Sequence, residues 1–486
     1  MGRYILSKAR DVFFSSVKHR NKCSILCRWS STQPRQWSTP LAKQLFEAIS
    51  TTGPIPLATF IRMCLTADRD GYYMSNKSNG QDQFGIKGDF ITSPEISQIF
   101  GELIGIWFVA EWIAQNKLDK RIELIEIGPG RGTLMDDILR TIRNFKQMSS
   151  SIDNIYLVET SPSLRNSQRE VLCGDVPMEN ISNGYRSMSK YMHVPITWVD
   201  NIRFIPPANE KTSFIVAHEF FDALPIHAFQ SVEIFDSSEN TTKEHYPENQ
   251  FLYKAPLGRN SDKIQWREMV VSTVKEPSKD TSEFQLTLSK NSTPHSLYLP
   301  EISTRYRKLK KTPGSVIEIS PESHVYAQEF ARRIGGSSSA PKPFPSGAAI
   351  IIDYGPLNTI PSNSLRGIRD HKRVSPFSFA GLVDLSADVD FFALAEAALA
   401  ASPEVEVYGP VEQASFLMNM GIKERAEMLI SKAGDNFEKK RRVESSWKRL
   451  IDRGVSGMGK VYKAMAIVPS SRNTRRPVGF GGNLSL

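Results

Sequence analysis

Acidic and glycine residues with a regular spacing stand out in the segment 121–140. Glu126 is followed by Gly128, Gly130 and Gly132, directly after an apolar run of strand length and before an apolar pattern of helical spacing. A strand, a glycine turn and a helix N-terminus together present backbone N–H groups to a ligand, and glycines allow the ligand to approach closely. Glu126 could accept hydrogen bonds from neighbouring N–H groups or from an ammonium group. The spacing therefore predicts a ligand-binding loop rather than a plain turn.

The spacing of these glycines also indicates which ligand binds. A dinucleotide fingerprint, G-x-G-x-x-G, requires glycine at position 133, where the chain has Thr133. The pattern E-x-G-x-G-x-G instead resembles motif I of the Rossmann-like methyltransferases that use S-adenosylmethionine. The next predicted strand ends in Glu159, which we expect to bind the ribose hydroxyls of the cofactor. An NAD-dependent oxidoreductase is a second hypothesis, disfavoured by Thr133 and by the late position of Glu159.

These motifs require an α/β fold of the doubly wound, Rossmann-like class. Apolar runs predict strands at 122–127, 154–159, 213–217, 315–319, 348–353, 404–408 and 460–468, and helices at 41–49, 56–65, 96–115, 133–148, 321–334, 391–401 and 411–433. Alternating residues predict antiparallel strands at 229–235, 268–274 and 284–288. Residues 178–190 and the long segment 357–385 read as loops, the second as a lid.

The predicted domain organisation follows from these elements. It consists of a presequence (1–36), a helical N-terminal part (37–115), a cofactor-binding core (116–228), a β-rich insertion (229–310), the remainder of the core with the lid (311–469) and a disordered tail (470–486).

Charge is distributed unevenly along the 486 residues. The net charge is +9, and residues 1–36 carry eight Lys or Arg against Asp11, a net of +7. This segment is Arg- and Ser-rich with an amphipathic pattern, which is typical of a mitochondrial presequence and predicts a matrix protein. The nearly neutral remainder does not indicate nucleic-acid binding. No apolar run is long enough to predict a membrane span.

Metal ligands are not predicted by the sequence. Of four cysteines, Cys23 and Cys27 lie in the predicted presequence, and Cys64 and Cys173 are far apart. The segment beginning at His218 resembles H-E-x-x-H but ends in aspartate, so we discount a zinc site there. We expect no metal.

Four segments carry a resemblance to a known family: 88–95 (GDFITSPE), 126–133 (EIGPGRGT), 218–225 (HEFFDALP) and 384–391 (DLSADVDF). In this order they resemble the MidA-like methyltransferases, whose mitochondrial members are assembly factors of respiratory complex I. The resemblance covers roughly residues 40–468. It implies a protein arginine methyltransferase that symmetrically dimethylates an arginine of a core subunit in the quinone module of complex I.

The acids at strand ends fit this chemistry. An arginine guanidinium has a pKa above 12, so its site should offer carboxylates that orient it and accept its proton during methylation. Glu219 and Asp222, beyond the predicted strand 213–217, are our expected catalytic residues, and Asp353, Asp384 and Asp390 are expected to bind the substrate. A non-catalytic assembly chaperone on the same fold is the third hypothesis. The sequence leaves open the target arginine, the oligomeric state and the presequence cleavage site.

Overall fold

The computed structural model describes residues 36–74, 91–115, 121–208, 210–234, 264–274, 282–470 and 475–482. Residues 1–37 and 38–486 form separate units, and the second contains every helix and strand named below. The predicted presequence lies outside the described residues except for its last position.

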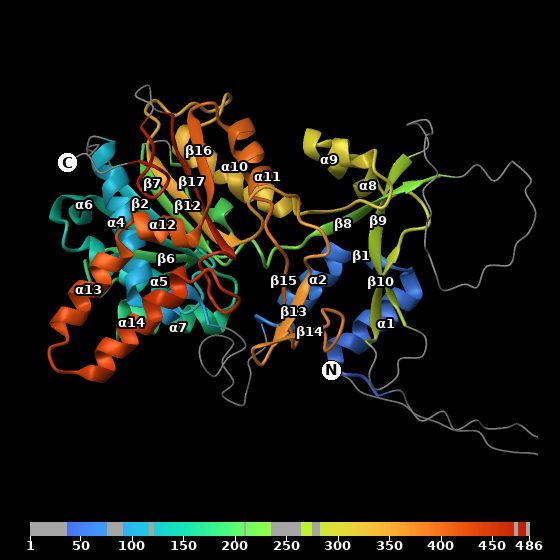
Figure 1. Ribbon diagram of the computed structural model, residues 1–486, viewed down its shortest axis with the longest axis horizontal. Coiled ribbons are helices and arrows are strands. Elements are labelled where there is room, and N and C mark those ends of the chain that lie inside the picture. Colours follow the sequence, from blue (N-terminus) through green and yellow to red (C-terminus); the bar gives the residue numbers. More distant parts are fainter. Residues whose placement is uncertain are drawn as a thin grey trace, which may run out of the picture. The chain divides into compact units, whose positions relative to one another are not determined.

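A nine-stranded mixed sheet lies at the centre of the 38–486 unit (Figure 1). Its order is β16-β17-β12-β7-β2-β3-β6-β5-β4, with β12, β7, β2, β3 and β6 parallel and β17 antiparallel between β12 and β16. The chain adds β3 and β6 on one side of β2 and then β7 and β12 on the other. The carboxyl ends of β2, β3 and β7 therefore meet at a topological switch point, where doubly wound sheets bind ligands. The strands are β2 (Ile122–Ile127), β3 (Ile152–Val158), β4 (Glu179–Ile181), β5 (Gly184–Met188), β6 (Pro195–Val199), β7 (Thr212–His218), β12 (Gly347–Tyr354), β16 (Val405–Glu412) and β17 (Tyr462–Pro469).

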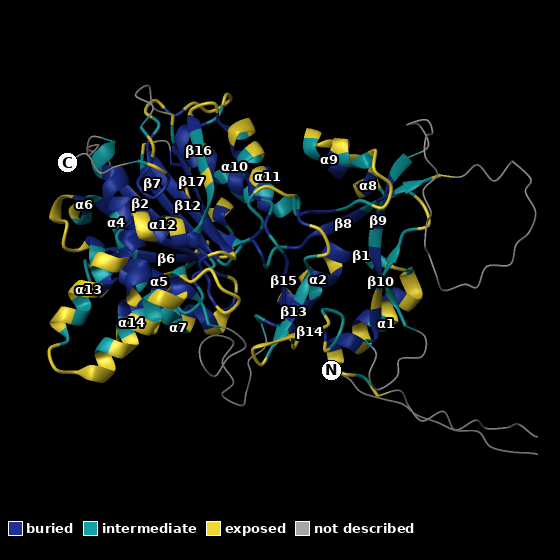
Figure 2. Ribbon diagram, in the orientation of Figure 1, coloured by how far each residue is buried: buried dark blue, intermediate teal, exposed yellow. Residues whose placement is uncertain are grey.

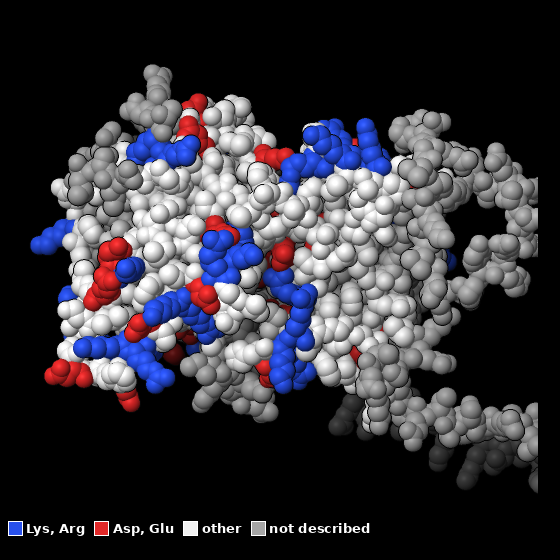
Figure 3. All heavy atoms as spheres, in the orientation of Figure 1, with Lys and Arg blue, Asp and Glu red and all other residues white. Residues whose placement is uncertain are grey.

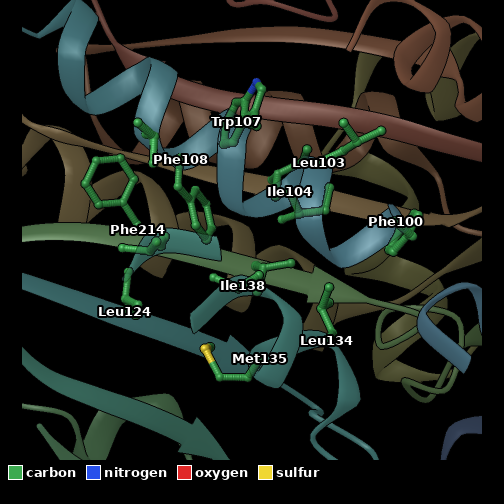
Figure 4. Close-up of a cluster of buried hydrophobic side chains, with 14 of the residues drawn as sticks. Phe100, Leu103, Ile104, Trp107, Phe108, Leu124, Leu134, Met135, Ile138 and Phe214 are labelled. Carbon is green, nitrogen blue, oxygen red and sulfur yellow. The ribbon is translucent and has the colours of Figure 1, made fainter. Parts of the chain in front are cut away.

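Helices cover both faces of this sheet, which explains why its central strands are apolar throughout. Side chains of one parity, such as Leu124 and Phe214, pack under α4 and α5, and Figure 4 shows Trp107 and Phe108 of α4 in this layer. Side chains of the other parity, such as Ile125, pack in a second cluster with α10 and α11. Figure 2 shows the buried strands between the partly exposed helices. The helices are α4 (Gln98–Ala114), α5 (Thr133–Ile142), α10 (Pro321–Gly335) and α11 (Phe391–Ala401).

A smaller antiparallel sheet contains the predicted β-rich strands but extends beyond the boundaries 229–310. Its order is β1-β9-β8-β11, and β10 pairs with β9. It recruits β1 from the N-terminal part and β11 from beyond residue 310. Helices α1 and α2 pack on one face, and α8 and α9 lie on the other. The elements are α1 (Pro40–Thr52), β1 (Ile55–Pro56), α2 (Leu57–Thr66), β8 (His227–Glu233), β9 (Ile264–Thr273), β10 (Phe284–Leu288), α8 (Pro294–Tyr298), α9 (Thr304–Lys310) and β11 (Val316–Ile319).

The segment predicted as a lid contains secondary structure of its own. Strands β13 (Arg366–Arg369), β14 (Lys372–Val374) and β15 (Asp384–Ser386) form a three-stranded antiparallel sheet. Val383 and Leu385 are buried with the apolar residues of α1 and α2. Strands of three or four residues are too short to give a clear periodicity in the sequence.

Several predicted boundaries are wrong for local reasons. The helix expected over 133–148 ends at Ile142 and is followed by α6 (Lys146–Ser151). The helix expected over 411–433 is divided into α12 (Gln413–Asn419) and α13 (Ile422–Lys432), because Gly421 adopts a φ of 83°. The expected loop 178–190 contains the hairpin of β4 and β5. Helix α14 (Phe437–Ile451) was not predicted, because its largely charged sequence shows little apolar periodicity.

The expected disorder of the tail is also wrong for residues 475–482. The Trp107 indole Nε1 donates to the Val478 carbonyl at 3.1 Å, and the Arg475 guanidinium lies 2.8 Å from the Glu111 carboxylate. Phe480 is buried against Phe416. Residues 471–474 and 483–486 lie outside the described part.

Surface charge on the face shown in Figure 3 occurs in separate groups of Lys and Arg, one of them over α9. Acidic side chains lie among several of these groups. None of the described helices is long and apolar enough to cross a membrane.

Candidate functional site

The glycine loop joins β2 to α5 at the switch point of the large sheet. Gly128, Gly130 and Gly132 have φ values of 66°, 52° and 86°, in the left-handed region that favours glycine. A Cβ atom on Gly128 would come within 2.8 Å of the Phe220 ring. The loop lines a cavity whose volume is about 210 Å³. The sequence therefore requires glycine here for both conformation and space.

A short helix, α3 (Ser93–Ile96), holds the other side of the loop. The Thr133 hydroxyl donates to Glu95 Oε1 at 3.0 Å, and the Arg131 guanidinium lies 3.4 Å from Glu95 Oε2. Thr92, Pro94 and Glu95 also line the cavity. The polar segment 88–95 thus borders the cavity in its described part, residues 91–95.

Glu126 is a buried acid near the end of β2. The side chain lines the cavity and is almost fully buried, and its Oε2 atom has no hydrogen-bond partner among the described residues. Burial, with a further contribution from the charge of Glu159, raises the pKa of Glu126 to about 8. A buried acid of this kind is suited to an incoming ammonium group, which would satisfy the oxygen and compensate the charge.

Glu159 follows the end of β3 and also lines the cavity. Its carboxylate accepts hydrogen bonds from the Ser161 backbone N–H at 2.8 Å and from Gln168 Nε2 at 3.2 Å. Gln168 Nε2 also donates to the Gly130 carbonyl at 2.7 Å, and Gln168 Oε1 accepts from the Trp198 indole at 2.9 Å. Gln168 therefore connects the glycine loop to Glu159. Sequence reasoning missed both Gln168 and Trp198, because their role depends on contacts between separate elements.

Glu219 lies where β7 ends and lines the same cavity. Its φ of 50° is unusual for a residue other than glycine and turns the side chain out of the strand direction. The Tyr462 hydroxyl donates to Glu219 Oε1 at 2.9 Å and also contacts the Tyr354 hydroxyl. Burial and the charge of Asp222 raise the pKa of Glu219 to about 8, although the hydrogen bond from Tyr462 acts to lower it. Burial lowers the pKa of the adjacent His218 to about 3, so the imidazole is neutral.

The other acids near Glu219 have different surroundings. Asp353 accepts N–H groups of Phe220 at 3.1 Å, Phe221 at 2.8 Å and Asp222 at 3.4 Å, which fixes the turn after Glu219. Asp222 is buried beside Asp353 and is not among the residues that line the cavity, and burial and the charge of Asp353 raise its pKa. Asp384 accepts from the hydroxyl of Tyr73, which does line the cavity. The fold thus brings Asp222, Asp353 and Asp384 together with Glu219.

Asp390 lies elsewhere. Its carboxylate caps α11 by accepting the Ala393 N–H at 3.2 Å, and it pairs with Arg305 at 2.9 Å and the Tyr306 hydroxyl at 3.0 Å. It borders a second cavity of about 20 Å³, too small for a side chain of a substrate. The expectation that Asp390 binds the substrate is therefore not supported by its position.

Comparison with known proteins identifies the family. Residues 103–411 match the model of a family of S-adenosyl-L-methionine-dependent methyltransferases. The chain belongs to this family. S-adenosylmethionine is accordingly the cofactor of this methyltransferase, and the acids and glycines of the cavity fit its ammonium and ribose groups.

Relatives of the methyltransferase cover most of its length. A mouse protein named "Protein arginine methyltransferase NDUFAF7, mitochondrial" is 34% identical over 92% of this chain and 88% of its own length. The human protein of that name is 33% identical (89% and 84%), and a Drosophila melanogaster homologue is also 33% identical (88% and 85%). These relatives are named as mitochondrial, which agrees with the broader prediction of a mitochondrial location.

A solved structure shares the fold of the methyltransferase. A protein from Burkholderia thailandensis bound to S-adenosyl-homocysteine aligns with a TM-score of 0.64 over 91% of this chain and 94% of that chain, at 20% identity. The predicted Rossmann-like α/β methyltransferase fold is confirmed.

Proposed function

We propose that this chain is an S-adenosylmethionine-dependent protein arginine methyltransferase of the mitochondrial matrix. Its proposed product is a symmetrically dimethylated arginine in a core subunit of the quinone module of complex I, made during assembly of the complex. The observation that carries the proposal is the ionisable Glu219 in the cofactor cavity, close to the buried acids Asp222 and Asp384. A guanidinium is the protein side chain that such a group of acids and tyrosines accommodates best.

The residues of the cavity divide the proposed work. S-adenosylmethionine supplies, when bound, an activated methyl group on its sulfonium. The glycine loop leaves space for the cofactor, Glu126 would hold its ammonium group, and Glu159 its ribose hydroxyls. Glu219, held by Tyr462, would orient the guanidinium and accept the proton that leaves the nitrogen as the methyl group is transferred.

Three residues expected at the reaction centre, Asp222, Asp353 and Asp384, have a supporting role in this proposal. Asp353 uses its carboxylate on backbone N–H groups and therefore positions Glu219 rather than the substrate. Asp222 and Asp384 add negative charge near Glu219, which favours a cationic side chain over a neutral one.

The activity is tested with the full chain, labelled S-adenosylmethionine and peptides that cover the arginines of the quinone-module core subunits. We expect symmetric dimethylarginine after hydrolysis, and loss of the label when arginine is replaced by lysine in the peptide. Incorporation into the lysine peptides would contradict the proposed specificity. Glu219→Gln should reduce the rate strongly while cofactor binding, followed by calorimetry, stays within a few-fold of the original.

The alternative of a non-catalytic assembly chaperone is tested in cells that lack the protein. If the Glu219→Gln chain restores complex I assembly as well as the unchanged chain does, the chaperone hypothesis replaces the enzymatic one.

Gly130→Val provides the matched test of the cofactor site. Since Gly130 has a φ of 52°, valine is strained there, and we expect loss of S-adenosylmethionine binding with the circular dichroism of a folded protein. NADH should not bind either form.

A further inference from the structure

Two histidines and a glutamate come together between the smaller sheet and the helix that covers it. His227 is on β8, Glu268 on the adjacent β9, and His295 on α8 (Figure 1). Their ligand atoms all lie within 4.8 Å of one another. None of the three lines the cofactor cavity. The cluster is thus a second group of polar side chains, which the proposed methyl transfer does not use.

Glu268 is the centre of this cluster. Its side chain is 0% exposed, and its two oxygens face different partners. Oε1 lies 2.8 Å from His227 Nδ1, and Oε2 lies 3.5 Å from His295 Nδ1 and accepts the Thr293 hydroxyl. The buried carboxylate therefore faces one imidazole nitrogen with each of its two oxygens.

The two imidazoles have different exposure. The side chain of His227 is 10% exposed and that of His295 is 46% exposed, and their ring centroids are 4.3 Å apart. The two imidazole rings and the buried carboxylate together offer three protein ligands to an ion. Because the outer ring is open to solvent, a fourth position is left for water. This is the donor set of His₂Glu zinc sites.

The distances are compatible with an ion after a small adjustment. In a tetrahedral zinc site with bonds of about 2.1 Å, two ligand atoms lie about 3.4 Å apart. The ligand atoms here lie within 4.8 Å of one another, so the longest separation must shorten by at most about 1.4 Å. His295 can close the difference, because its side chain is half exposed and it belongs to a helix of only five residues.

We propose that His227, Glu268 and His295 form a binding site for a divalent transition-metal ion of the zinc class. Imidazole nitrogen with one carboxylate favours zinc and its neighbours over magnesium and calcium. The bound ion would connect α8 to β8 and β9 and so stabilise the smaller sheet. The sequence predicted no metal, because the three ligands are 41 and 27 positions apart and form no motif.

Zinc binding to the full chain tests the proposal. The metal-free protein is dialysed against zinc, and bound metal is measured by mass spectrometry alongside the melting temperature. For the unchanged chain we expect one equivalent of bound zinc and a rise of a few degrees in melting temperature. For His295→Ala we expect zinc binding weaker by about tenfold or more and no such rise. His193→Ala, which removes an exposed histidine of the β5–β6 turn, is the matched control and should bind as the unchanged chain does.

The His295→Ala variant is expected to fold, because the His295 side chain is half exposed. Its melting temperature without metal should equal that of the unchanged chain within about a degree. Equal zinc content and equal melting shifts in the unchanged chain and His295→Ala would overturn the proposal, because any bound zinc would then be held by other residues. Glu268→Gln gives a second test, since it retains the shape but removes the charge, and zinc binding undiminished by this change would also overturn it.

Discussion

Replacement of Glu126 by glutamine tests whether Glu126 ionises when the cofactor binds. Burial and the charge of Glu159 raise the pKa of Glu126 from 4.5 to about 8. At about 1.4 kcal/mol for each pH unit, ionisation of Glu126 costs about 5 kcal/mol more in the empty folded protein than in the unfolded chain. At pH 7 the carboxyl group is therefore about nine-tenths protonated in the absence of cofactor.

Binding of the cofactor ammonium should reverse this state. A cation beside Glu126 favours the carboxylate, so binding below pH 8 must release up to one proton. We expect the affinity for S-adenosylmethionine to rise about tenfold between pH 6 and pH 7 and to level off near pH 8. Above that pH the amino group of the cofactor loses its own proton, with an ordinary pKa of about 7.7–8.0, and the affinity should fall again.

Glu126→Gln should remove the acidic side of this profile. A charge-assisted hydrogen bond contributes about 1.5–3 kcal/mol, so the variant should bind about 10- to 150-fold more weakly than the original at pH 8 and nearly as well at pH 6. Calorimetry at pH 6, 7 and 8 in phosphate and in imidazole, buffers with different ionisation enthalpies, measures the affinity and the released protons together.

Two results would refute the reasoning about Glu126. One is an affinity of the unchanged chain that does not vary between pH 6 and pH 8, and the other is an undiminished proton release in Glu126→Gln. The cofactor-free protein offers an independent check. Because the folded pKa of Glu126 is raised, its contribution to stability is lost as pH rises from about 4.5 to about 8, and Glu126→Gln should lose less stability over this interval.

Three further substitutions test other parts of the structure. Glu159→Ala should weaken cofactor binding about 10- to 100-fold, because the two hydrogen bonds proposed between Glu159 and the ribose hydroxyls are lost. The circular dichroism spectrum should remain that of a folded protein. An unchanged affinity would show that Glu159 does not belong to the ribose site. Tyr462→Phe removes the hydrogen-bond donor that lowers the pKa of Glu219. The rising limb of kcat against pH should therefore move to higher pH, while the KM for the cofactor stays constant. A pH profile that does not shift would contradict this role of Tyr462. Arg333→Met should destabilise the protein by about 3–5 kcal/mol in denaturant unfolding, because it leaves the buried Glu123 without its charged partner. Combination with Glu123→Leu should recover part of the loss, and an equal loss in the single and double variants would count against the pairing.

Local features of this protein could be predicted because neighbouring residues determine them. The strand, glycine turn and helix of 122–142 depend on apolar periodicity and on residues that tolerate a positive φ. Glu126 and Glu159 could be assigned to one cavity, since the ends of adjacent parallel strands must meet at one edge of the sheet. The basic, amphipathic residues 1–36 predicted the mitochondrial location by composition alone.

The tertiary structure decided which acids and which partners surround that cavity. Glu219 and Asp353 both follow or end strands, yet Asp353 binds backbone N–H groups and only Glu219 lines the cavity. Tyr462 reaches Glu219 from 243 positions along the chain, and Gln168, in α7 (Pro162–Cys173), connects Gly130 of the glycine loop to Glu159. Such contacts depend on how the strands are ordered in the sheet and on how the helices pack against them. The sequence by itself determined the fold class and the cofactor loop, whereas the identity of each partner side chain depended on packing between distant elements.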